Sequence, residues 1–198
     1  MAGPPPDSLI RLFPLNLPNT LTVLRILLVP VLVVALTAEV SGGPAIAAGV
    51  FAAAAITDGL DGYIARTRQS VTTFGKVMDP VADKLLIAAA LVSLISLDRL
   101  APWVAMVIIA REFAVSGLRI AAGQQGVVIP ASMLGKVKTI VQVAAVLALI
   151  AANDPDAAWV QALVYAMVAV TVASGADYFL NFRRRIDQIA RRRAESAP

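Results

Sequence analysis

Six long apolar blocks constrain the fold of this chain more than any other feature of its sequence. Each block is close to the roughly 20 residues that a helix needs to cross a membrane, and breakers such as Gly43, Pro80, Pro102 and Pro155 mark the joints. The blocks cover approximately residues 20–38, 44–65, 80–97, 101–121, 132–152 and 157–180. Because 59% of the residues are hydrophobic, more than in an ordinary soluble domain, we predict an all-α polytopic membrane protein with six transmembrane helices.

The charges between the blocks predict how the chain is oriented. Lys and Arg gather in alternate joints and after residue 180, whereas the opposite joints hold Arg99 with Asp98, Asp154 and Asp156. Under the positive-inside rule, both ends and the 66–84 joint face the cytosol. We therefore expect three parts. They are an N-terminal tail with an interfacial segment (1–19), a six-helix transmembrane domain (20–180), and a basic cytosolic tail (181–198) that contacts anionic lipid headgroups.

The amino acids that the chain lacks limit which catalytic groups and metal ligands it can provide. The chain has no Cys and no His, which excludes disulfides, thiolate sites, imidazole bases and His-ligated zinc. A general base must then be Asp, Glu, Lys or Tyr, and a bound metal must be held by oxygen, which favours Mg²⁺, Mn²⁺ or Ca²⁺. Topology explains the net charge of +4, so we expect no nucleic-acid partner.

Four aspartates lie close together in the sequence between the second and third blocks. Asp58 and Asp61 are spaced i, i+3, and Asp79 and Asp83 are spaced i, i+4, so each pair lies on one helix face. A hairpin of the two helices would bring all four carboxylates together, and ionised carboxylates in such a site need cations. One or two divalent ions would meet that need, and two-metal sites suit displacement at phosphorus. The alternative is that these are ordinary polar residues at helix ends on the membrane surface.

The residues between the two pairs fit the same chemistry. Gly62 leaves space for a ligand beside the backbone, and Arg66, one turn further, could clamp a phosphate. Gly75 is expected in the turn between the two helices.

This stretch resembles the signature of the CDP-alcohol phosphotransferases. The resemblance rests on eight positions within the 26 residues from Asp58 to Asp83, all of which match: Asp58, Asp61, Gly62, Ala65, Arg66, Gly75, Asp79 and Asp83. It implies a fold of six transmembrane helices, usually as a homodimer. It also implies transfer of a phosphoryl-linked group from a CDP ester to a second alcohol, with release of CMP.

The resemblance also implies roles for individual residues. Asp58, Asp61 and Asp79 would bind Mg²⁺ or Mn²⁺, as two ions, and Asp83 would join the second ion and act as general base on the acceptor hydroxyl. The residues implied to contact the CDP-lipid are Gly62, Arg66, Thr72 and Asn19.

A second group of charges lies in the other half of the chain. Arg111, Arg119, Lys136 and Lys138 are expected near the cytosolic side of two spans, where they could bind an acceptor phosphate, and Glu112 could pair with Arg111. Ionisable residues inside a membrane are functional candidates. Alternatively, their long side chains extend to lipid headgroups.

Short segments in both halves of the chain indicate which acceptor is used. The run from Pro18 to Ile26, the AREF and GLR segments and the GKVKT segment are similar to bacterial family members whose acceptor is sn-glycerol 3-phosphate. That similarity implies CDP-diacylglycerol as donor and a place in the bacterial cytoplasmic membrane, among membrane lipids, with the site facing the cytosol. Sister enzymes that use inositol phosphate or phosphatidylglycerol remain alternatives. Outside the family, so do a divalent-cation transporter and a non-catalytic scaffold.

Overall fold

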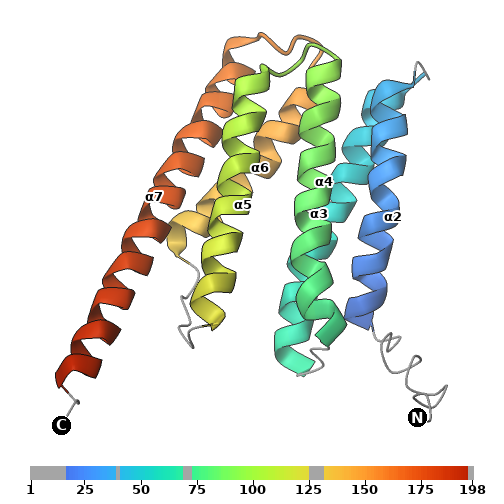
Figure 1. Ribbon diagram of the computed structural model, residues 1–198. Coiled ribbons are helices and arrows are strands. Elements are labelled where there is room, and N and C mark those ends of the chain that lie inside the picture. Colours follow the sequence, from blue (N-terminus) through green and yellow to red (C-terminus); the bar gives the residue numbers. More distant parts are fainter. Residues whose placement is uncertain (1–16, 39–40, 69–72, 125–131, 196–198) are drawn as a thin grey trace, which may run out of the picture. The chain divides into compact units, whose positions relative to one another are not determined.

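The computed structural model describes the backbone of residues 17–38, 41–68, 73–124 and 132–195. The side chains of 17–19, 58–68, 73–77, 79 and 189–195 lie outside this description. Within the described ranges, every regular element is an α-helix (Figure 1). The helices are α2 (Leu17–Thr37), α3 (Gly43–Arg68), α4 (Thr73–Ser96), α5 (Pro102–Gln124), α6 (Met133–Ala151) and α7 (Ala158–Glu195). The all-α prediction is confirmed.

Three helices in the described part are long and apolar enough to cross a membrane. These spans are Thr20–Thr37 in α2, Met133–Ala151 in α6 and Ala158–Gln188 in α7. The apolar part of α3 ends at Thr57, ahead of the aspartates, and α5 carries Arg111, Glu112 and Arg119. Large apolar side chains such as Leu27, Met106 and Ile140 point outward, where hydrocarbon solvates them better than water does. The chain is a membrane protein.

Two local predictions were wrong. Pro80 lies inside α4, which begins at Thr73, and Gly75 lies in the first turn of that helix and not in the connecting turn. α7 continues to Glu195, through most of the segment expected as the basic tail. A proline within a helix bends it and does not always end it. Arg and Ala are strong helix formers, so the basic segment expected as a tail can extend α7.

The first unit of the chain ends at Asp98 and contains α2, α3 and α4. α2 packs against both α3 and α4, and Figure 1 shows α3 running opposite to the other two. The core of this unit includes the fully buried Leu32, Phe51 and Leu91. Gly42 makes the turn from α2 to α3 at φ +81, a conformation that favours glycine.

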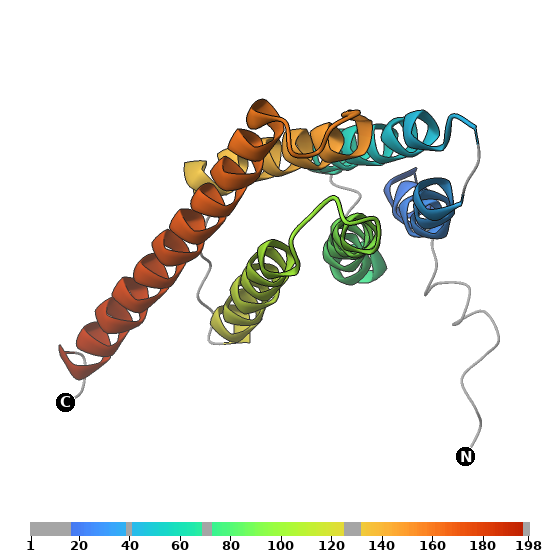
Figure 2. The ribbon, with the colours of Figure 1, turned by 90° about the horizontal axis from the view of Figure 1, so that it is seen from above.

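The second unit begins at Arg99 and contains α5, α6 and α7. α7 packs against both α5 and α6 (Figure 2). The Arg99 guanidinium donates to the carbonyl of Ala152 and so joins the start of α5 to the end of α6. At the other end of α6, the Ser132 hydroxyl caps the helix by accepting from the backbone N–H of Gly135 at 3.2 Å.

Replacing Gly43 should destabilise the first unit. A Cβ added at Gly43 would lie 2.9 Å from the backbone carbonyl oxygen of Ala35, which cannot rotate away. We expect Gly43→Ala to lower the free energy of unfolding by about 1–3 kcal/mol, as other overpacking changes do. The matched control is Gly49→Ala in the same helix, where no atom lies within 4 Å of the added Cβ. Gly49→Ala should be neutral or stabilising by up to about 1 kcal/mol. Unfolding in detergent micelles measures both, and equal stability of the two variants would contradict this account.

Candidate functional site

The four aspartates lie within α3 and α4 and not at their ends. α3 continues past Asp61 to Arg68, and α4 begins at Thr73, well before Asp79. The predicted i, i+3 and i, i+4 spacings therefore fall on regular helix, so the members of each pair share a helix face. The apolar part of α3 ends at Thr57, just before the first pair, so the alternative of ordinary polar residues at the membrane surface stays beside the metal-site prediction.

The predictions for most residues of this motif stay untested. Asp83 is the one motif aspartate whose side chain is described, and it is half-buried. The other predicted metal and CDP-lipid ligands lie outside the described side chains: Asp58, Asp61, Asp79, Gly62, Arg66, Thr72 and Asn19. Within the described part, no three acidic side chains come together, but three of the four motif aspartates are not in it. Whether the carboxylates converge remains a prediction.

The donor chemistry of the chain fits a hard divalent cation. With no His and no Cys in the sequence, carboxylate, carbonyl and hydroxyl oxygens are the available ligands, and these suit Mg²⁺ or Mn²⁺. The carboxylate of Asp83 is half-buried in α4 and belongs to this class of oxygen ligand.

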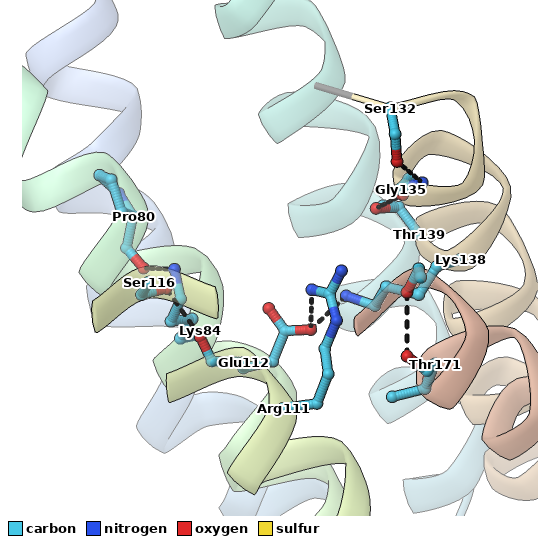
Figure 3. A network of polar contacts seen from close by, with 11 residues as sticks. Pro80, Lys84, Arg111, Glu112, Ser116, Ser132, Gly135, Lys138, Thr139 and Thr171 are labelled. Atoms are coloured by element: carbon cyan, nitrogen blue, oxygen red, sulfur yellow. Dashed lines mark hydrogen bonds and ion pairs between the residues drawn. The ribbon is translucent and has the colours of Figure 1, made fainter. Parts of the chain in front are cut away.

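The second unit holds a network of three charged side chains between α5 and α6. One carboxylate oxygen of Glu112, Oε1, accepts from Lys138 Nζ at 2.5 Å and from Arg111 Nη1 at 3.2 Å. Figure 3 shows both cations turned toward this oxygen. The side chains of Arg111, Glu112 and Lys138 are only 15%, 14% and 10% exposed. Two cations share one anion, so the network keeps a net positive charge available to an anionic ligand.

The neighbouring helices hold this network in place. Gly175 in α7 lies against Arg111, so that a Cβ there would come within 3.2 Å of Arg111 Cγ. The absence of a side chain at Gly175 leaves the space that Arg111 occupies. On α5, the Ser116 hydroxyl donates to the Glu112 carbonyl at 2.7 Å. Arg111 therefore sits between its own helix and α7, near the middle of α5 and not at a helix end.

The structure brings together two of the four predicted acceptor-binding residues. Arg111 and Lys138 meet at Glu112, and the predicted partnership of Arg111 with Glu112 is confirmed. Lys136 is exposed on α6. The Arg119 guanidinium lies over the ring of Tyr178, 5.9 Å from its centroid. Neither Arg119 nor Lys136 has a contact with Glu112 in the described network.

The buried polar residues of this unit that sequence reasoning missed include Gln142 and Thr171. They are 2% and 0% exposed. The signal available in the sequence was the position of Gln142, four residues after Lys138 in an otherwise apolar block. That spacing places both residues on one helix face.

Comparisons with known proteins identify the family. A model of the CDP-alcohol phosphatidyltransferase family matches residues 15–173. The chain is 42% identical over 180 residues to CDP-diacylglycerol–glycerol-3-phosphate 3-phosphatidyltransferase of Bacillus subtilis, covering 83% of this chain and 93% of that protein. A protein of the same name from Rickettsia felis is 45% identical over 135 residues, covering 68% and 75%. Cardiolipin synthase (CMP-forming) of rice is 40% identical over 185 residues, covering 86% and 55%. The chain belongs to the CDP-alcohol phosphatidyltransferase family.

Breaking the charged network should reveal strong coupling between α5 and α6. Glu112→Gln leaves two mostly buried cations without their anion, and we expect the free energy of unfolding to fall by about 3–5 kcal/mol. Lys138→Met in the Glu112→Gln background should restore part of this loss because it removes one of the repelling charges. A double-mutant cycle measures the coupling, which should lie between about 0.5 and 3 kcal/mol. The control cycle pairs Glu112→Gln with Lys136→Met, whose lysine is exposed on the same helix, and should be additive. Equal coupling in both cycles would contradict the network.

Proposed function

We propose that this chain transfers the phosphatidyl group of CDP-diacylglycerol to sn-glycerol 3-phosphate, giving phosphatidylglycerophosphate and CMP. The observation that carries the proposal is the buried pair of cations, Arg111 and Lys138, that share Glu112. This pair occurs in a chain with the complete aspartate motif of the family. The names of the relatives from Bacillus subtilis and Rickettsia felis describe the same reaction.

The cations favour an acceptor that carries a phosphate. A buried positive site attracts an anion strongly because the surrounding medium screens charge poorly, and guanidinium groups match phosphate oxygens in geometry. A cationic acceptor such as ethanolamine or choline would be repelled. Arg111 and Lys138 would bind the phosphate directly, and the exposed Arg119 and Lys136 would attract the acceptor from solution.

The aspartates would provide the phosphoryl-transfer chemistry. Asp58, Asp61 and Asp79 would hold one or both of two Mg²⁺ or Mn²⁺ ions, and Asp83 would join the second. When bound, these ions offset the negative charge of the diphosphate and of the departing CMP. The CDP portion of the donor would lie against Gly62 and Arg66, with Thr72 and Asn19 as further contacts.

Asp83 would act as the general base. In the reaction, a hydroxyl oxygen of the acceptor forms a bond to the phosphorus of the phosphatidyl group, and the bond from that phosphorus to the CMP oxygen breaks. The proton of the attacking hydroxyl passes to the Asp83 carboxylate. With no His in the chain, a carboxylate beside the acceptor is a suitable group for this step.

The location and assembly of the protein follow from the same proposal. All six helices α2 to α7 would span a bacterial cytoplasmic membrane, with both chain ends and the site facing the cytosol, where glycerol 3-phosphate is available. The positive charge of the cytosolic joints and of the end of α7 supports this orientation. Two copies would form a homodimer, as the family resemblance implies.

A second candidate function is cardiolipin synthesis by the same chemistry, with phosphatidylglycerol as acceptor. The rice relative of that name is 40% identical to this chain. The transferases from Bacillus subtilis and Rickettsia felis are 42% and 45% identical to it. A member that uses inositol phosphate is a further sister activity with a phosphorylated acceptor. The aspartates would also suit the ion path of a divalent-cation transporter, but family membership favours transfer over transport.

The acceptor can be identified by measuring CMP release. Purified protein with CDP-diacylglycerol and Mg²⁺ should release CMP with glycerol 3-phosphate, and not with phosphatidylglycerol or inositol phosphate supplied separately. Chelation of divalent ions should abolish release. Release with a different acceptor would keep the family chemistry and overturn the choice of substrate. No release with any acceptor, from folded protein, would overturn the proposed function.

Asp83→Asn should remove the base while keeping the fold. We expect kcat to fall by about 10²–10⁴-fold, which is the usual contribution of a general base, or further if a metal ligand is lost as well. The control is Asp98→Asn at the opposite end of α4. Asp98 is exposed with φ 54, a conformation that asparagine also tolerates. Circular dichroism should show the same helix content in both variants, and full turnover by Asp83→Asn would rule out the assigned role.

A further inference from the structure

Among the described side chains of the second unit, five buried polar atoms have no hydrogen-bond partner. Three of them are Arg111 Nε, Gln142 Nε2 and Thr171 Oγ1. Gln142 and Thr171 are almost completely buried, at 2% and 0% exposure. Leaving such a group unsatisfied costs about 1–3 kcal/mol, so each needs a physical explanation.

Gln142 and Thr171 each lie one helical turn from a residue that contacts the network. Gln142 follows Lys138 by one turn on the buried face of α6, and Lys138 contacts Glu112. Thr171 precedes Gly175 by one turn of α7, and Gly175 lies against Arg111. In Figure 3 the dashed line at Thr171 is the hydrogen bond that its backbone carbonyl accepts from the Ser174 hydroxyl at 3.0 Å, which leaves the Thr171 hydroxyl unpaired. Tyr178, three residues after Gly175, also has an unpartnered hydroxyl, and its ring contacts Arg119.

The chemistry of these groups indicates what they could bind. The cations Arg111 and Lys138 match a phosphate, whereas an amide and a hydroxyl are neutral and both donate and accept hydrogen bonds. Neutral groups of this kind match the hydroxyls of an alcohol. One helical turn, a rise of about 5.4 Å, separates Lys138 from Gln142. A three-carbon alcohol phosphate can bridge that separation.

We propose that Gln142 and Thr171 bind the secondary hydroxyl of the acceptor and determine its specificity, while Arg111 and Lys138 bind its phosphate. This inference rests on the proposed function, because it assumes that a phosphorylated alcohol enters the second unit. The bound acceptor supplies the missing partners of the two side chains. A site that hydrogen-bonds a substrate hydroxyl rejects an analogue without it, because buried polar groups are then left unpaired.

The test compares two acceptors that differ by one hydroxyl. 3-Hydroxypropyl phosphate has the phosphate and the primary hydroxyl of sn-glycerol 3-phosphate but lacks the secondary hydroxyl. Wild-type protein should prefer glycerol 3-phosphate. Gln142→Met should raise the KM for glycerol 3-phosphate by about 10–100-fold, the loss of one or two hydrogen bonds to a buried hydroxyl. It should change the KM for the analogue and for CDP-diacylglycerol little, so that the preference is lost. Thr171→Val, nearly the same shape, should act in the same direction.

Two further variants separate recognition from folding. Lys138→Met removes a phosphate contact and should raise the KM for both acceptors equally. Thr139→Val makes the same change as Thr171→Val at an exposed hydroxyl that donates to the Gly135 carbonyl, and should alter neither KM. Without ligand, Gln142→Met and Thr171→Val should raise the thermal unfolding temperature, because each removes a buried unpaired polar atom. A purely structural role for these side chains would not produce higher stability together with lost selectivity.

The inference is overturned if both variants retain wild-type selectivity, or if the KM for both acceptors rises equally, which would place the contact at the phosphate. It is also overturned if wild-type protein does not distinguish the two acceptors. In each of these cases CMP is still released with glycerol 3-phosphate, so the proposed function stands. Absence of CMP release by wild-type protein with any acceptor is the separate result that defeats both.

Discussion

The carboxylate of Glu112 holds two cations on a single oxygen, inside a unit whose other interior side chains are mostly apolar. Charges in such surroundings are stable only when they are paired, so the positions of Arg111 and Lys138 depend on this anion. The pairing joins α5 to α6, and α7 adapts to it by having glycine where Arg111 passes. Two cations with one anion leave the network positive, which is the property that suits it to a phosphate.

The same electrostatic rule applies to the first unit, with the opposite sign. Four aspartates fall on regular helix in α3 and α4, and four carboxylates at the edge of apolar helices require positive charge. In the second unit Glu112 supplies counter-charge to Arg111 and Lys138. In the first, the proposed divalent ions would add positive charge beside the aspartates and would also serve phosphoryl transfer. Each half of the chain therefore carries a charge that a component of the proposed reaction could compensate.

The membrane reverses the usual cost of exposed apolar groups and increases that of unpaired polar ones. Large apolar side chains on the outer faces of α2, α5 and α6 are acceptable in hydrocarbon, whereas each unpartnered polar atom inside the second unit lowers stability. In the ligand-free protein, the unpaired polar atoms of Gln142 and Thr171 reduce stability. A bound ligand that pairs with them would remove this cost. A substrate that satisfies them would connect stability with specificity, and this is the trade-off expected where a binding site is prepared in advance.

The sequence alone determined the helical class, the membrane setting, the family and the helical spacing of the four aspartates. Apolar block length and motif spacing are local properties, so they can be read from residues that are close together in the chain. Local reasoning was wrong about Pro80 and Gly75, because a helix can continue through a proline. Only the tertiary structure decided that Arg111 and Lys138 share Glu112, that Arg119 and Lys136 do not, and that Gln142 and Thr171 are buried. Contacts between residues far apart in the chain depend on how α5, α6 and α7 pack, and the sequence pattern of one helix carries no information about which face of another will meet it.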